Sequence, residues 1–285
     1  MEREIIQRKK IKRDDVKKWV LFSVLLVVAF FMIYPLFWML FTSVKANKHV
    51  YGTGLLPPEW HLENYIKIWS EVDLLLGFRN STLITVPIVV VSVFFSGLAA
   101  YAFAKLNFPG KNIVFFGMLG TSMVPFAVTM LPQFILFKEM GLLKGATAYV
   151  VPRLTGGIFT IFFLRQFLYG VPDSVIEAAK LDGASQPTIF VKVVLPLLTP
   201  ALVAQVILGF IGTWNDYLGP LLFIRSNEWK TIPLLIAAFN SGTTGANNET
   251  PMLMAASIVS MVPVLVVFAI FQKQIINNVM LSGVK

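Results

Sequence analysis

The sequence predicts an all-α fold: a polytopic integral membrane protein with six transmembrane helices. Of its 285 residues, 56% are hydrophobic and only 14% are charged, which is far more apolar than a soluble domain. Long uncharged runs recur along the chain, and each approaches or exceeds the roughly 20 apolar residues that cross a bilayer as a helix. The alternating pattern of barrel strands does not occur, and backbone amides must be paired within hydrocarbon, so the spans are expected to be helical.

Six segments fit this description. Four carry no charge, at residues 19–41, 81–104, 112–137 and 251–271. The other two, at 146–164 and 195–223, each contain one ionisable residue, Arg153 and Asp216 respectively. We therefore expect one transmembrane domain over residues 19–275, preceded by a basic tail at 1–18 and followed by a second tail at 276–285.

The distribution of basic residues predicts the orientation. Eight of the 24 Lys and Arg residues lie within the first 18 positions, directly before the first apolar run. That run is too long for the hydrophobic part of a secretory signal, and no small-residue cleavage site follows it, so it is expected to remain as a span. Basic segments stay on the cytoplasmic side, so we expect both termini in the cytoplasm and the chain in the inner membrane. The net charge of +9 then indicates a membrane anchor rather than a nucleic-acid partner.

This orientation places the polar stretch at 171–196 in the cytoplasm. Ser174 and Glu177 have the spacing of a capping box, and Asp173 adds favourable charge, so a helix is expected to begin there. Gly183 tolerates a positive φ and ends that helix. Pro187 suits the first turn of a second helix, which is expected to run to a break at 195–196.

Both short helices carry apolar residues that no membrane span requires. They are Ala178, Ala179 and Leu181 on the first helix, and Ile189, Phe190, Val193 and Val194 on the second. Apolar surface in the cytosol predicts a docking partner, although the same loop also has a plainer interpretation as a connector.

Four groups of residues resemble a known family. Glu177-Ala178-Ala179, Asp182-Gly183-Ala184, Phe190 and Leu195-Pro196 resemble the EAA loop of ABC importer permeases. Asn80-Ser81, Trp214-Asn215-Asp216-Tyr217 and Leu281-Ser282-Gly283-Val284-Lys285 are similar to the carbohydrate-importer branch, specifically its smaller, maltose-type permease. The resemblance extends over nearly the whole chain. It departs at the C-terminus, where relatives often continue with a glycine and where Asn277-Asn278 replace a more usual acidic-glycine pair.

The resemblance implies transport of a carbohydrate across the membrane by alternating access. It implies two ATP-binding subunits that hold ATP and magnesium, a second paralogous permease and an extracytoplasmic solute-binding protein. The residues that it assigns to ATPase coupling are Glu177, Ala178, Ala179, Leu181, Asp182, Gly183, Ala184, Leu195 and Pro196.

The sequence also limits what this chain does alone. It contains no P-loop motif, so it is expected to be a transport subunit without its own ATPase site. It has no cysteine and two histidines, and no H-E-x-x-H motif, so no metal or other cofactor is expected on this chain.

Two questions remain open at this level. Arg153 and Asp216 form either a structural ion pair or, with Trp214, Asn215 and Tyr217, part of the translocation path. Trp214 and Tyr217 also fit an interfacial aromatic belt. The alternative functions are an importer of glycerol-phosphate-like solutes and a non-transporting membrane scaffold that recruits an ATPase.

Overall fold

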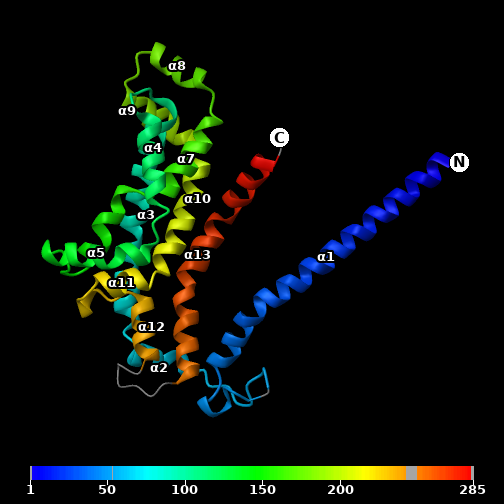
Figure 1. Cartoon of the computed structure of the whole chain (residues 1–285). Coiled ribbons are helices and arrows are strands. Elements are labelled where there is room, and N and C mark those ends of the chain that lie inside the picture. Colours follow the sequence, from blue (N-terminus) through cyan, green and yellow to red (C-terminus); the bar gives the residue numbers. More distant parts are fainter. Residues whose placement is uncertain (1, 53, 242–248, 284–285) are drawn as a thin grey trace. The chain divides into compact units, whose positions relative to one another are not determined.

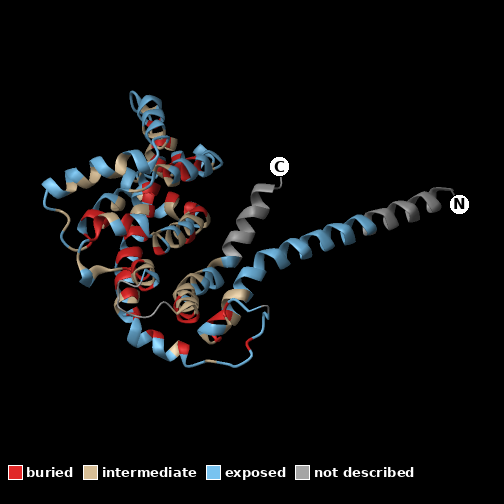
Figure 2. Ribbon diagram, turned by 60° about the horizontal axis from the view of Figure 1, so that its bottom comes forward, coloured by how far each residue is buried: buried red, intermediate tan, exposed pale blue. Residues whose placement is uncertain are grey.

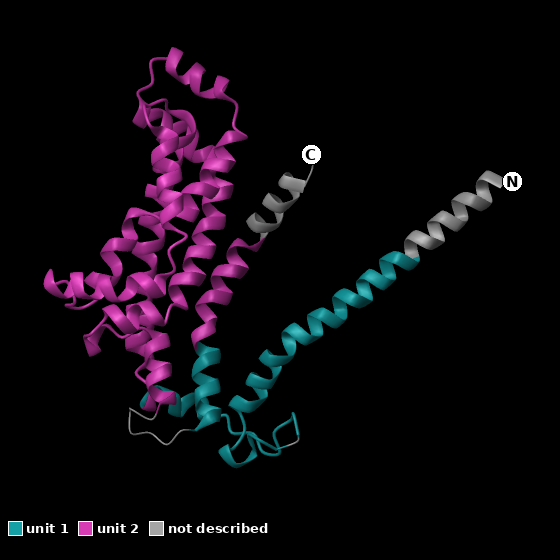
Figure 3. Ribbon diagram, viewed as in Figure 1, with its two compact units in different colours: residues 1–70, 247–259 teal, residues 71–246, 260–285 magenta. Residues whose placement is uncertain are grey.

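The computed structural model describes residues 2–52, 54–241 and 249–283, and the regular elements within these ranges are all helical (Figure 1). The chain divides into two compact units (Figure 3). One comprises residues 1–70 and 247–259, and the other comprises residues 71–246 and 260–285.

The first unit contains the long N-terminal helix α1, Glu2–Ser43. Its part from Val16 to Ser43 is long and apolar enough to span a membrane, which agrees with the expected span at 19–41. The described part of the basic segment at 1–18 is helical and continuous with this helix. The 3-10 turn η1 (Asn47–His49) follows, then α2 (Asn64–Glu71), which ends at the boundary with the second unit.

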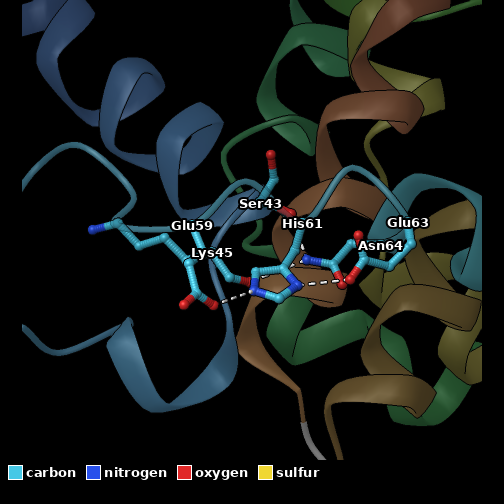
Figure 4. A network of polar contacts seen from close by, with 6 residues as sticks. All are labelled: Ser43, Lys45, Glu59, His61, Glu63 and Asn64. Atoms are coloured by element: carbon cyan, nitrogen blue, oxygen red, sulfur yellow. Dashed lines mark hydrogen bonds and ion pairs between the residues drawn. The ribbon is translucent and has the colours of Figure 1, made fainter.

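The connection after α1 is a folded loop (Figure 4). Asn64 donates from Nδ2 to the carbonyl oxygens of Ser43 at 2.9 Å and Lys45 at 3.2 Å, and the backbone N–H of His61 donates to Val44 O at 2.8 Å. These donors satisfy carbonyls at and just beyond the C-terminus of α1, where helical partners end. The buried Lys45 donates from Nζ to Gly54 O at 2.7 Å, which fixes a second point of the loop.

The His61 ring lies between two carboxylates in the same loop (Figure 4). Its Nδ1 is 2.6 Å from Glu63 Oε1, and its Nε2 is 3.6 Å from Glu59 Oε2. The hydrogen bond with His61 lowers the pKa of Glu63 below its ordinary value.

The second unit contains most of the helices. They are α3 (Leu74–Lys105), α4 (Lys111–Thr121), α5 (Phe126–Glu139), α6 (Thr147–Val150), η2 (Val151–Thr155), α7 (Ile158–Tyr169), α8 (Asp173–Leu181), α9 (Gln186–Ile189), the π-helical turn η3 (Phe190–Val194), α10 (Leu195–Trp214), α11 (Leu218–Phe223), η4 (Asn227–Trp229) and α12 (Ile232–Asn240). The last helix, α13 (Thr250–Gly283), begins in the first unit and ends in the second.

Helix α3 is the central element of the second unit, since it packs against α7, α10 and α12. Its buried positions recur along its length, from Leu74 to Phe103, and Figure 2 shows buried residues gathered in the interior of this unit. One core cluster joins the end of α3 to α7, α8, η3 and the start of α10. A second joins the middle of α3 to α6 and α11.

Five described helical segments are long and apolar enough to cross a membrane: 16–43, 74–105, 147–169, 186–214 and 250–272. A sixth is possible if α4 and α5 count as one span, although they are bent by 94° where they meet. The expected span at 112–137 crosses this bend. Uncharged length alone does not reveal a bend, because a kinked pair and a straight helix have the same composition.

The expected span at 146–164 is also interrupted. Between η2 and α7, Gly156 has φ +100°, and a Cβ placed there would lie 2.6 Å from Ser96 Oγ on α3. The same Oγ accepts the N–H of Gly157 at 3.2 Å, so α3 satisfies a backbone group that the break leaves free. The break therefore depends on glycine for both its conformation and its close approach to α3.

The expected span at 195–223 differs from the structure at both ends. Helix α10 ends at Trp214, and the short α11 begins at Leu218. The predicted break at 195–196 is wrong, because residues 186–214 form one continuous helical segment. The π turn η3 precedes Pro196, and there Leu195 N–H donates to Phe190 O in place of the α-helical pattern.

Candidate functional site: the α8 loop and two helix breaks

Helix α8 begins differently from the prediction. It starts at Asp173 with Pro172 at its N-cap, and no side chain caps it, so the predicted capping box of Ser174 and Glu177 is wrong. The Asp173 carboxylate instead accepts a hydrogen bond from Lys105 Nζ at 2.6 Å. This contact lowers the pKa of Asp173 below its ordinary value.

The predicted end of α8 at Gly183 is confirmed. Gly183 has φ +79°, its N–H donates to Lys180 O at 3.0 Å, and the N–H of Ala184 donates to Ala179 O at 3.0 Å. These bonds satisfy carbonyls of the last helical turn. A Cβ at Gly183 would meet no described heavy atom within 4 Å, so the turn is open on its outer side.

Helix α8 lies at one end of the second unit and is largely exposed (Figure 1). Ile176 is its buried residue, at 3% exposure, whereas Leu181 is 89% exposed. The other coupling candidates on and after the helix are exposed or half-buried: Glu177, Ala178, Asp182 and Gly183 are exposed, and Ala179 and Ala184 are half-buried.

The second predicted apolar face does not need an external partner. Ile189, Phe190 and Val194 are buried in the core of the second unit, and Val193 packs against that core. Of the last two coupling candidates, Leu195 is half-buried and Pro196 is exposed. Helical periodicity in the sequence predicted this apolar face. It did not predict that α3, which is distant in the sequence, covers the face.

Arg153 and Asp216 lie together, which is the ion-pair arrangement that the sequence left open as one of two alternatives. Arg153 Nη2 is 3.5 Å from Asp216 Oδ2, and Tyr149 Oη donates to the same Oδ2 at 2.8 Å. The guanidinium lies over the Tyr149 ring at 3.9 Å and donates from Nη1 to Tyr149 O at 3.1 Å. We call Tyr149, Arg153, Asp216 and Gly219 the break cluster.

The break cluster joins two interrupted helices. Asp216 Oδ1 accepts the N–H of Gly219 in the first turn of α11 at 3.1 Å, and Arg153 donates to a carbonyl at the end of α6. A carboxylate at a helix start and a cation at a helix end both complement the backbone dipoles. Sequence reasoning missed Tyr149 and Gly219. The available signals were their spacings, four residues before Arg153 and three residues after Asp216.

The other residues of the Trp214–Tyr217 segment divide by exposure. Trp214 is 3% exposed, donates from Nε1 to Ser260 O at 3.1 Å and stacks on Phe210 with ring centroids 5.4 Å apart. Its environment is therefore a packed interior and not an interfacial belt. Asn215 and Tyr217 are exposed.

The Asn80-Ser81 pair also has a structural position. Asn80 Nδ2 donates to Glu228 O at 2.8 Å and Lys230 O at 3.0 Å, and Ser81 Oγ accepts the N–H of Ile232 at 3.0 Å. The pair thus fixes the start of α12 on α3. At the C-terminus, residues 277–278 and 281–283 lie in α13, whereas Val284 and Lys285 lie outside the described residues.

No group of three or more His, Asp or Glu side chains is placed to hold a metal ion in the described ranges.

The described elements are all helical, and five or six of them are long and apolar enough to span a membrane, which is the architecture of a multi-pass membrane protein. The chain belongs to the family described as binding-protein-dependent transport system inner membrane component, whose profile matches residues 70–280. It is therefore a multi-pass inner-membrane permease subunit of an importer that works with an ATPase and a solute-binding protein.

Named relatives cover almost the full chain. It is 34% identical to an arabinooligosaccharides transport system permease protein of Halalkalibacterium halodurans, over 97% of this chain and 99% of the relative. It is 29% identical to a diacetylchitobiose uptake system permease protein of Streptomyces coelicolor, over 91% and 84%. It is 28% identical to a trehalose/maltose transport system permease protein of Thermococcus litoralis, over 96% and 99%.

A solved structure has the same fold. It is the crystal structure of a bacterial ABC transporter involved in the import of the acidic polysaccharide alginate. A chain of it superposes with a TM-score of 0.79 at 24% identity, covering 91% of this chain and 96% of that one.

Proposed function

We propose that this chain translocates a carbohydrate by alternating access, powered by ATP that two partner subunits bind with magnesium and hydrolyse. A second paralogous permease completes the pathway, and an extracytoplasmic binding protein delivers the solute. Support for the substrate class comes from relatives named for arabinooligosaccharides, diacetylchitobiose and trehalose/maltose.

The observation that carries the mechanism is the exposure of α8 at one end of the second unit. Leu181 is almost fully exposed although it is apolar, and Glu177 and Ala178 lie on the same uncovered helix. Val175 on the same helix is also exposed, at 40%, and apolar side chains exposed on a helix outside the membrane-length segments support a docking contact. We assign that contact to the ATPase subunit, with coupling residues Glu177, Ala178, Ala179, Leu181, Asp182, Gly183 and Ala184, and with Leu195 and Pro196 at the start of α10.

The coupling role is tested by Gly183→Val in the reconstituted importer. At φ +79° a β-branched residue is disfavoured, so the turn after α8 should change shape while the open space around it leaves the rest of the fold intact. We expect normal membrane insertion but loss of solute-stimulated ATPase activity and of uptake, with a milder loss for Glu177→Lys. Gly183→Asn is the matched control, because asparagine tolerates a left-handed conformation and should retain most activity.

Uptake at the wild-type rate by the Gly183→Val complex would contradict coupling through this loop. The assay uses arabino-oligosaccharide, diacetylchitobiose, maltose and glycerol 3-phosphate as separate probes. Uptake of glycerol 3-phosphate alone would favour the alternative substrate class. ATPase binding without uptake of any probe would favour a scaffold.

The orientation is tested with a single thiol. We call residues 171–186 the α8 loop. The chain has no cysteine, so Ser185→Cys in this exposed loop gives one reactive site. With both termini cytoplasmic, a membrane-impermeant maleimide should label it only after the cells are permeabilised. Labelling of intact cells would reverse the proposed orientation.

A further inference from the structure

The end of α3 contacts both ends of the α8 loop. Lys105 Nζ donates to Val171 O and to Asp173 Oδ1, each at 2.6 Å, at the point where the loop enters α8. Tyr101 Oη donates to Gln186 Oε1 at 2.6 Å, at the point where the loop enters α9. Tyr101 and Lys105 are four residues apart, so they lie on one face of α3, one above the other.

The two donors extend from the packed interior. The Lys105 side chain is only 5% exposed, whereas its partner Asp173 is 76% exposed. A lysine ammonium this deeply placed requires acceptors, and its two acceptors both belong to the entry of the loop. Tyr101 is 2% exposed, and its ring packs against Phe190 with centroids 5.7 Å apart. This packing fixes the position of the Tyr101 hydroxyl.

The middle of the loop is held far less. Its contacts with the core are apolar: Ile176 is buried in the core cluster, and Ala179 and Ala184 pack against that cluster, while the outer side of the turn at Gly183 is open. The polar attachments to α3 are at the two ends, with the exposed helix between them. Such a loop moves with α3 if both ends hold, and only the apolar packing holds it if they do not.

We propose that Tyr101 and Lys105 are positioning residues that clamp the two ends of the α8 loop to α3, so that a displacement of α8 moves α3 instead of being absorbed within the loop. Because α3 packs against α7, α10 and α12, the displacement reaches the centre of the second unit. The inference rests on the proposed function of α8 as the ATPase contact. Neither residue touches the ATPase or solute in this scheme.

The clamp itself is tested by distance measurement, independently of transport. The chain lacks cysteine, so Leu98→Cys on α3 and Leu181→Cys on α8, both exposed, supply two spin-label sites. In nanodiscs of phosphatidylethanolamine and phosphatidylglycerol, double electron–electron resonance should give one narrow distribution of the distance between the two spin labels. Tyr101→Phe and Lys105→Met should each broaden it, and the double variant should broaden it most.

Matched controls separate the clamp from general effects of the substitutions. Lys192→Met removes an exposed lysine, and Tyr169→Phe removes a hydroxyl while keeping the ring beside Arg165; both should leave the distribution narrow. Lys105→Arg retains a cation with several donors and should restore it. An unchanged distribution in the Tyr101→Phe/Lys105→Met double variant would overturn the clamp.

The consequence for coupling is read from solute taken up per ATP hydrolysed, with arabino-oligosaccharide, diacetylchitobiose, maltose and glycerol 3-phosphate as separate probes. Tyr101→Phe loses one hydrogen bond, and we expect this ratio to fall about fivefold. Lys105→Met loses a charge-assisted pair, and we expect a fall of about tenfold or more with ATPase association retained. A broadened distribution with an unchanged ratio would overturn the positioning role. Loss of coupling in Gly183→Val is scored separately, so failure of the α8–ATPase contact would be distinguishable from failure of the clamp.

Discussion

The α8 loop and the break cluster both connect segments that are far apart in the sequence, but they use charge differently. At the loop, buried Lys105 reaches a carboxylate that is 76% exposed. In the break cluster, the Arg153 and Asp216 side chains are only 33% and 26% exposed, and Asp216 also binds Tyr149 and Gly219. The first arrangement attaches an exposed helix to the core, and the second completes two interrupted helices within it. Substitutions should therefore affect coupling at the loop and stability at the break cluster.

The largest loss of stability is expected from Asp216→Ala. It removes the acceptor of Tyr149 Oη and of Gly219 N–H, and leaves Arg153 without its counter-ion. We expect a destabilisation of about 3 kcal/mol, measured as lower thermal stability of the purified chain. Glu228→Ala, which removes an exposed carboxylate from the same unit, is the control.

The charge-swapped pair Arg153→Asp/Asp216→Arg sharpens this prediction. It restores opposite charges but gives Gly219 N–H no acceptor. We therefore expect the thermal stability of the purified chain to lie between that of Asp216→Ala and that of the unchanged chain. Complete recovery would show that the charge pair alone matters and that the capping contact contributes nothing.

A smaller loss is expected from Gly219→Ala. A Cβ there would lie 2.5 Å from both Asp216 Oδ2 and Tyr149 Cε2, so the cluster must shift to admit one methyl group. Overpacking of this kind costs about 2 kcal/mol. Gly183→Ala adds the same methyl group at the open turn of the loop. We expect Gly183→Ala to lower the thermal stability of the purified chain less than Gly219→Ala does.

The smallest effect is expected from pH at Asp173. Its pKa is lowered from an ordinary 3.8 by Lys105, so its contribution is fully present above that value and is lost only as pH falls through the lowered pKa. The spin-label distance between α3 and α8 should therefore be the same at pH 6 and pH 8. Asp173→Asn should broaden it less than Lys105→Met, because the bond to Val171 O remains. A change between pH 6 and 8 would mean that another group controls the loop.

The sequence was informative where local chemistry decides the structure. Gly183 ends α8 because the turn there needs a positive φ, and Pro187 lies in the first turn of α9 as expected. The contact of Arg153 with Asp216 was one of two alternatives that the sequence left open, since an ionisable residue within a membrane span needs a partner.

The predictions from sequence failed where contacts between residues far apart in the chain determine the local structure. Asp173 pairs with Lys105, 68 positions away, and α8 has no side-chain cap at its start. The interruption at Gly156 depends on Ser96 of another helix. Pro196 does not break its helix, because it follows a turn in which the backbone bonds already depart from the α pattern, so its missing N–H is less disruptive there.

The π turn at Phe190–Val194 joins α9 to α10 within one continuous helical segment. Residues 186–214 form one helical segment of about 40 Å at 1.5 Å per residue, with Pro200 inside it, so a displacement at Gln186 is passed along a continuous helix toward Trp214. A π turn holds one residue more than an α turn, and each α-helical residue corresponds to roughly 100° of rotation. The extra residue is therefore contained within one wider turn, and it displaces by one position in the sequence the residues that continue the face of α9 into α10. If one residue were deleted, an ordinary α turn would complete nearly the same rotation, so the two ends of the segment should keep their relative orientation while the helix stays continuous.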